Sequence, residues 1–144
     1  FRTKNKEATS SDIKSSKTSV DPSMKYTLGS SPSFMKHGVN MREYFGKAQC
    51  EDADFLFLEV NGGHYQEFLD RKSSFIYYVL EGSGTFFLDG EAIPVQATDV
   101  IHAPKNTRIY YLGTMKLLLC VAPAWDETNE EEIRLIDPSH LPSS

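Results

Sequence analysis

The sequence is poor in cysteine, in positive charge and in long apolar runs. Only Cys50 and Cys120 occur, outside any C-x-x-C pair, and we interpret them as reduced, partly buried thiols; one disulfide or a reactive thiol are the alternatives. The net charge of −5 argues against nucleic acid or an anionic membrane as a partner. No run has transmembrane length and no signal peptide is recognised, so we expect a cytoplasmic protein.

Helical periodicity is almost absent, and no internal repeat is long enough for a propeller or a solenoid. The length of 144 residues suits one domain with one core. Residues 1–23 are rich in Ser and Thr and hold few hydrophobic side chains, so they predict a flexible tail or linker. We therefore predict a single domain over residues 24–144, with its core at 54–123.

β patterns fill that core. Phe75–Leu80 is a run of six β-branched, aromatic and aliphatic residues that stops at Gly82-Ser83-Gly84, and Asp89-Gly90 predicts a tight hairpin. Further turns are predicted at Asn61-Gly62-Gly63 and Gly113-Thr114. The predicted strands are 55–60, 64–68, 75–80, 85–88, 92–95, 99–103, 108–112 and 116–121. This spacing predicts an all-β, antiparallel sandwich or barrel of jelly-roll type.

Three features outside the strands leave alternatives open. Asn40–Gly46 predicts a short helical turn or an irregular edge segment. Asp126–Glu132 holds five acids in seven residues, which is typical of a solvated turn or of the first turn of a helix. Trp125, the sole Trp, is expected to cap the barrel or to pack at an interface.

Three motifs taken in order resemble the core of a cupin. They are Tyr78-Val79-Leu80-Glu81-Gly82-Ser83-Gly84, the Asp89-Gly90 hairpin, and the stretch from Asp99 to Thr107 that contains Pro104. The resemblance implies a small jelly roll, or double-stranded β-helix, of the kind found in germins and in RmlC-like sugar-nucleotide epimerases. It also implies a homodimer.

The resemblance further implies where metal ligands would stand. Counted from Gly82, the family's Glu position is Phe75 and its two His positions fall near Leu69 and Arg71; counted from Pro104, the last His position is Ile109. None of these side chains donates an electron pair to a cation as the family's ligands do. Reading His64-Tyr65-Gln66 as a remnant of the first His pair still leaves the Glu and the last His missing. We predict no metal and no cofactor.

Strand alternation then selects the interior side chains. If Phe75 faces inward, so do Tyr77 and Val79, and if Ile109 faces inward, so does Tyr111. The residues predicted to bind a ligand are Gln66, Phe75, Tyr77, Ile109 and Tyr111. The alternative is that these aromatic side chains simply fill the barrel.

Three functions follow from this interior. The first is a metal-free cupin that binds a small organic ligand. The second is an epimerase or isomerase of the sugar-nucleotide type, with His64 or His102 and Tyr77 or Tyr111 as acid–base groups, so that His64, His102 and Tyr77 are the catalytic candidates. The third, a metal-dependent oxygenase or isomerase, is disfavoured by the missing ligands.

Overall fold

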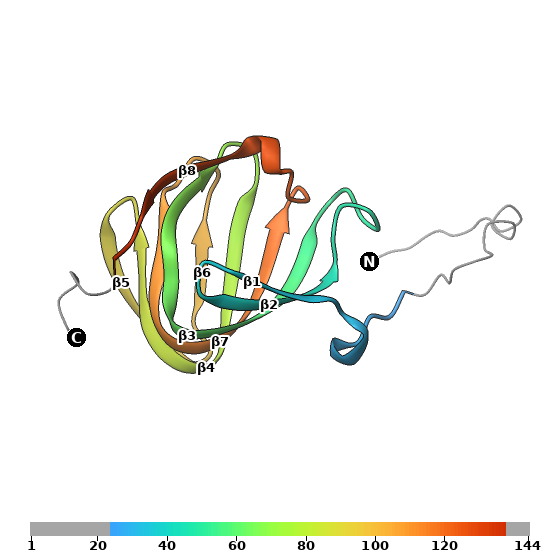
Figure 1. Cartoon of the computed structure of the whole chain (residues 1–144), viewed down its shortest axis with the longest axis horizontal. Helices are drawn as coiled ribbons and strands as arrows, with labels where there is room; N and C mark the ends of the chain where they lie inside the picture. Colours follow the sequence, from blue (N-terminus) through green and yellow to red (C-terminus); the bar gives the residue numbers. More distant parts are fainter. Residues whose placement is uncertain (1–23, 138–144) are drawn as a thin grey trace, which may run out of the picture.

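The structure, a computed structural model, describes residues 24–137, so the predicted tail at 1–23 lies outside the described residues. Eight antiparallel strands curl around a common interior (Figure 1). Two 3-10 turns, Leu28–Ser30 and Glu127–Asn129, are the only helical elements within 24–137, so the predicted all-β jelly-roll fold is confirmed. The strands are β1 (Ser33–Lys36), β2 (Val39–Phe45), β3 (Asp54–Asp70), β4 (Ser74–Leu88), β5 (Glu91–Gln96), β6 (Val100–Ala103), β7 (Ile109–Ala122) and β8 (Glu130–Leu135).

The pairing order explains how the sheet encloses an interior. The strands pair in the order β1-β2-β3-β7-β4-β5, while β6 pairs with the first half of β4 and β8 with the last part of β3. Because β3, β4 and β7 each bend sharply, their two halves face each other across the core. The segment predicted at 40–46 is the edge strand β2 and not a helical turn.

Glycines at three predicted turns make bends and not strand ends. Gly62, Gly113 and Gly84 lie opposite one another in β3, β7 and β4, so one line of glycines crosses the sheet. Gly113 has φ of 137°, and a Cβ there would lie 2.5 Å from Gly84 Cα. Each pair of predicted short strands therefore forms one long strand. The predicted Asp89-Gly90 hairpin is confirmed, with φ values of 51° and 85°.

The two faces of β4 differ as the alternation predicts. Phe75, Tyr77 and Val79 point inward and are buried, with exposed fractions of 6%, 1% and 0%. Ile76, Tyr78 and Leu80 point outward and are about one-third exposed, at 36–37%. The outer face of this strand therefore carries no second layer among the described residues.

No helix within residues 24–137 is long and apolar enough to cross a membrane.

Candidate active site

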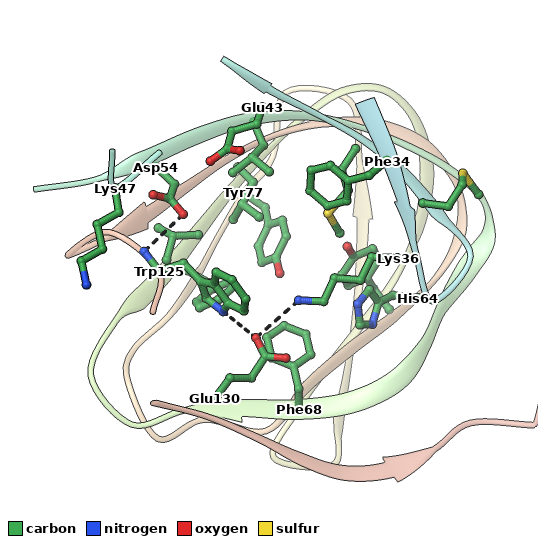
Figure 2. A pocket seen from close by; sticks show the side chains of 17 residues that line it. Phe34, Lys36, Glu43, Lys47, Asp54, His64, Phe68, Tyr77, Trp125 and Glu130 are labelled. Atoms are coloured by element: carbon green, nitrogen blue, oxygen red, sulfur yellow. Dashed lines mark hydrogen bonds and ion pairs between the residues drawn. The ribbon is translucent and has the colours of Figure 1, made fainter. Parts of the chain in front are cut away.

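A cavity of about 530 Å³ opens between the two halves of the curled sheet (Figure 2). Its wall is mostly apolar. Strands β3, β4 and β7 supply the floor, while β1 and the segment that contains Trp125 and Glu130 lie over it. A concave, apolar space with a few polar groups is what a small-molecule site requires.

His64 is the best-defined polar group in the cavity. It is 2% exposed, and its Nδ1 lies 2.8 Å from the carbonyl oxygen of Gln66. A carbonyl only accepts, so Nδ1 carries the proton in the neutral ring and Nε2 holds the free electron pair. Burial lowers the pKa of His64 to about 3, and the charges of His37 and Lys36 add to that direction. The imidazole is therefore neutral at physiological pH and able to accept a proton.

Tyr77 and Tyr111 stand beside this histidine. Tyr77 comes from β4 and Tyr111 from β7; both are 1% exposed, their ring centroids are 5.4 Å apart, and Tyr111 lies 5.2 Å from the His64 ring. Burial raises the pKa of both phenols, and the hydrogen bond between them raises that of Tyr77 further. Both hydroxyls therefore stay protonated. Tyr77 donates its proton to the Tyr111 oxygen, so the Tyr111 hydroxyl is the one free to donate a hydrogen bond to a ligand oxygen.

Lys36, Glu130 and Trp125 form a polar group above the cavity. Glu130 Oε1 accepts a hydrogen bond of 2.7 Å from Trp125 Nε1 and lies 3.5 Å from Lys36 Nζ. The Lys36 ammonium also lies 4.7 Å from the centre of the Trp125 ring. Figure 2 shows Lys36 next to His64, so an ammonium and a neutral imidazole share one end of the cavity.

Asp54, Glu43 and Lys47 lie at the other end of the cavity in Figure 2. Asp54 is 6% exposed; its Oδ2 accepts a hydrogen bond of 3.2 Å from the Trp125 backbone N–H, and its buried Oδ1 has no partner within the described residues. Burial raises the pKa of Asp54 to about 6, and the charge of Glu43 adds to the effect. This carboxyl is ionised at neutral pH but incompletely satisfied.

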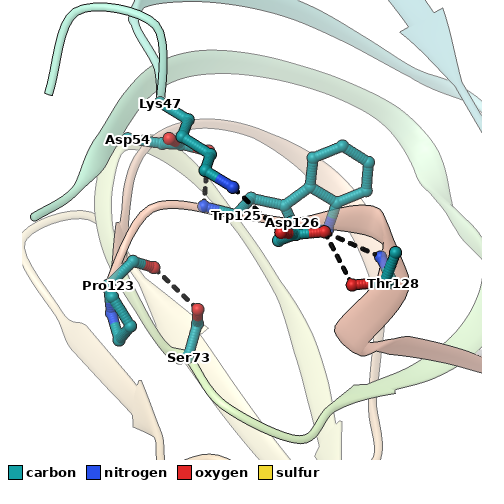
Figure 3. Close-up of polar contacts among 7 residues, drawn as sticks. All are labelled: Lys47, Asp54, Ser73, Pro123, Trp125, Asp126 and Thr128. Atoms are coloured by element: carbon teal, nitrogen blue, oxygen red, sulfur yellow. Dashed lines mark hydrogen bonds and ion pairs between the residues drawn. The ribbon is translucent and has the colours of Figure 1, made fainter. Parts of the chain in front are cut away.

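The segment that carries Trp125 is held at both sides (Figure 3). Ser73 Oγ donates to the Pro123 carbonyl at 2.6 Å, and Lys47 Nζ donates to Asp126 Oδ2 at 2.9 Å. Asp126 Oδ1 in turn accepts from the backbone N–H and the hydroxyl of Thr128. These contacts fix the indole between the two ends of the cavity, so of the two roles predicted for Trp125 the structure shows the cap.

The structure places the predicted site residues in two groups. His64, Phe75, Tyr77 and Tyr111 line the cavity. Gln66, Ile109 and His102 are not among the residues that line it, although Ile109 faces inward as predicted; the site roles given to the three stay predictions. The β3–β7 register shifts between His64 and Phe68, so Gln66 leaves the cavity wall and pairs with Leu135 of β8.

Ile109 and His102 are displaced for different reasons. Ile109 is 1% exposed but packs in the core opposite Phe68, one inward position beyond Tyr111. His102 is exposed on the outer face, since it alternates on β6 with the buried Ile101 and Ala103. His102 therefore cannot act together with His64.

The positions at which cupins hold a metal do not fit one here. Phe75 lines the cavity without a donor atom, and Ile109 is in the core. Arg71 is half-exposed and paired with Glu131 at 2.8 Å. Within residues 24–137, no group of three His, Cys, Asp or Glu side chains lies together as a cation would require. We therefore derive no chemistry through a metal.

Lys36, Glu130 and Asp54 were missed by the sequence reasoning. Lys36 lies in a stretch without a strand pattern, Glu130 in an acidic run expected to face solvent, and Asp54 just before a predicted strand. Only Asp54 carried a signal, because it has the same parity as the inward residues Leu56 and Leu58.

No protein-family model matches the chain, and no curated protein matches its sequence. Among solved structures, Pac13, described as a nucleoside dehydratase with a β-barrel, is 42% identical over 85% of this chain and 100% of its own, with a TM-score of 0.79. Variants of Streptomyces PAC13, two with a Tyr changed to Phe and one with a His changed to Gln, were solved with uridine. An RmlC-like cupin from Shewanella frigidimarina is 17% identical, covers 74% of this chain and 96% of its own, and has a TM-score of 0.61.

The chain belongs to the same family of small β-barrels as Pac13, and it has the fold of the RmlC-like cupins.

Proposed function

We propose that this protein binds a nucleoside in its barrel and eliminates water from it. One observation carries the proposal. The His and the two Tyr that are substituted in the PAC13 variants solved with uridine are separated by 13 and 34 positions. Here His64 and Tyr77 are separated by the same 13 positions, and Tyr77 and Tyr111 by the same 34. These three side chains meet at one end of the cavity.

The chemistry of this end suits an elimination. His64 accepts a proton from a sugar carbon at Nε2, the neighbouring C–O bond breaks as the C=C bond forms, and the hydroxide leaves as water after taking a proton from Lys36. Tyr111, oriented by the hydrogen bond from Tyr77, donates to a ligand oxygen, and neither phenol needs to ionise. Neutral imidazole is a weak base, so the C–H bond must be acidified, as in a ribose that carries a carbonyl group.

The charge of the cavity favours a nucleoside over a nucleotide. The two lysines that line it are each close to a carboxylate, Lys36 to Glu130 and Lys47 to Asp126. Three carboxyls, Glu43, Asp54 and Glu130, also line it, and the residues that line it include no arginine. A phosphate group would therefore meet repulsion without a dedicated cation. The same argument disfavours a sugar nucleotide, and with it the epimerase alternative.

Two measurements test the proposal. Isothermal titration should show uridine binding to the wild-type protein. Mass spectrometry should show the loss of one water from a uridine derivative oxidised at the sugar, and this turnover should disappear in His64→Gln while uridine binding is retained. Turnover that persists unchanged in His64→Gln would contradict the assignment.

The homodimer stays a prediction. The outward row Ile76, Tyr78 and Leu80, continued by Val100 at 58% exposure, is an apolar surface that a second copy would cover. Sedimentation of the wild-type protein and of Tyr78→Lys tests it: a wild-type dimer that the substitution dissociates is expected, and a wild-type monomer at micromolar concentration would contradict it.

A further inference from the structure

A β-bulge follows His64 and sets the tautomer of its ring. His64 pairs with Tyr111 and Phe68 with Ile109, so three residues of β3 stand opposite one residue of β7 and lose the regular pairing. The carbonyl of Gln66 lies in this bulge and accepts a hydrogen bond of 2.8 Å from His64 Nδ1–H. Because the proposed elimination needs the free electron pair of Nε2, the part of the chain that orients this carbonyl also orients the base.

The orientation of that carbonyl is tied to Glu67. The Gln66 carbonyl and the Cα of Glu67 belong to one rigid peptide plane, so turning the oxygen requires the backbone at Glu67 to turn as well. The Glu67 side chain is 0% exposed, and its Oε1 accepts a hydrogen bond of 2.8 Å from Arg134 Nε of β8. The two residues are also register partners, so both a side-chain bond and the strand pairing hold this point of the bulge.

Glu67 is a buried carboxylate outside the cavity. Arg134 supplies its shortest contact, is half exposed, and has its Cζ 5.6 Å from the centre of the Tyr110 ring. Arg108 Nη1 lies farther away, 3.8 Å from Oε2, and Oε2 has no hydrogen-bond partner within residues 24–137. Burying such a pair costs desolvation, and apolar side chains of the same size would stabilise the fold at least as well. The pair is therefore better explained by the geometry that it fixes than by stability.

We infer that Glu67 and Arg134 are positioning residues for His64: their pair fixes the bulge so that the Gln66 carbonyl keeps the ring protonated at Nδ1. This inference rests on the proposed function, in which His64 is the base, and adds two residues that do not line the cavity. Without the pair the peptide turns and the bond to Nδ1 weakens. The ring then also adopts the other tautomer, whose Nε2 carries a proton and cannot accept one.

The test compares Glu67→Met, Glu67→Gln and the control Glu131→Met. Met fills the space of Glu67 without an acceptor, and the half-exposed Arg134 then binds water, so no unpaired charge is buried. Gln keeps an oxygen for Arg134 Nε. Glu131→Met removes another 2.8 Å pair, between Arg71 and Glu131, which joins the turn after β3 to β8 away from the bulge.

Nitrogen-15 NMR of the histidine rings reports the tautomer, and the His64 signals are those that His64→Gln lacks. Wild type, Glu67→Gln and Glu131→Met should each show one tautomer, protonated at Nδ1. Glu67→Met should show both tautomers, and its kcat for the nucleoside should fall about 10-fold, the effect of one hydrogen bond, while KM changes less. Arg134→Met should shift the tautomer in the same direction and decides the question if Glu67→Met does not fold.

An unchanged His64 tautomer in folded Glu67→Met or Arg134→Met overturns the inference and leaves the proposed function standing. An equal shift in Glu131→Met also overturns it, because the effect would then not belong to the bulge. A wild-type ring protonated at Nε2 overturns it whether or not any variant folds. If the tautomer shifts as expected but the wild type eliminates no water from a nucleoside, the positioning of His64 stands and the proposed function fails.

Discussion

The two ends of the cavity hold similar numbers of charged and polar groups, but they differ in how far these groups are satisfied within the protein. At the first end His64 Nδ1 is bonded to Gln66, Tyr77 to Tyr111, and Glu130 Oε1 to Trp125. At the second end Asp54 Oδ1 has no partner among residues 24–137. The first end is therefore set in place before a ligand arrives, as catalysis requires, whereas one carboxylate oxygen at the second end stays unsatisfied.

The pKa values follow the same contrast. Burial moves the pKa of His64 down to about 3 and holds the pKa of Tyr77 well above its ordinary value, so neither group changes charge near neutral pH. Burial moves the pKa of Asp54 up to about 6, which brings it close to neutral pH. Burial alone therefore does not decide what a polar group can do. Its hydrogen-bond partners within the protein determine whether it can still accept a hydrogen bond from another group.

The largest effect is expected at His64. His64→Gln removes the proposed proton acceptor while keeping a polar side chain, so turnover of the proposed nucleoside substrate should fall about 10²- to 10⁴-fold. Steady-state kinetics with purified protein measures it. The matched control is His102→Gln on the outer face, which should leave kcat unchanged. Equal losses in both variants would contradict the separation of the two histidines.

The next effect concerns the Tyr77–Tyr111 pair. Tyr111→Phe removes the buried hydroxyl that can donate to a ligand oxygen, and Tyr77→Phe removes the hydrogen bond that orients it, so each should lower kcat/KM about 10-fold. Tyr78→Phe, on the outer face of the same strand, is the control and should not change it. A loss of kcat/KM in Tyr78→Phe as large as in Tyr77→Phe would contradict the assignment of the site to the inward face of this strand.

A third effect concerns the ammonium at the first end. Lys36→Met keeps the length of the side chain but removes the proposed acid for the leaving hydroxide, so kcat should fall about 10²-fold while uridine binding changes less. Comparing kcat with the dissociation constant of uridine separates the two roles. A variant that loses binding but keeps kcat would place Lys36 in ligand binding alone.

The smallest effect is on stability and concerns the second end. The folded pKa of Asp54, about 6, lies above the value of about 3.9 in an unfolded chain, so the ionised carboxyl destabilises the fold above pH 6, and this penalty vanishes below about pH 4. Asp54→Asn should therefore raise the free energy of unfolding by about 1 to 3 kcal/mol at pH 8, with little change at pH 4. Urea unfolding at the two pH values measures it, and a variant destabilised at pH 8 would contradict the assignment.

The sequence allowed the first end to be predicted better than the second. Alternation along one strand placed Phe75, Tyr77 and Val79 inward, and the cupin motifs supplied the fold. Periodicity works there because the strand is regular through those residues. The same reasoning failed for Gln66, because the register shift after His64 changes which side chains face the cavity. A β-bulge of this kind has no recognisable pattern of polar and apolar residues in the sequence.

The residues that cover the cavity were beyond the reach of sequence reasoning. Lys36 and Glu130 come from short strands near opposite ends of the described chain, and they meet only because β1 and the Trp125 segment lie over the same opening. Local pattern assigned Glu130 to a solvated acidic run. Its partner Trp125 Nε1 shows why that prediction failed: a carboxylate at the start of a strand can turn inward toward a part-buried donor.

A structure of the His64→Gln variant with uridine tests the central claim most directly. We predict the ribose at the first end, with a sugar carbon within about 3.5 Å of the residue 64 side chain, and the base toward the second end. Uridine bound outside the barrel, or with its base beside residue 64 and its ribose at Asp54, would contradict the account.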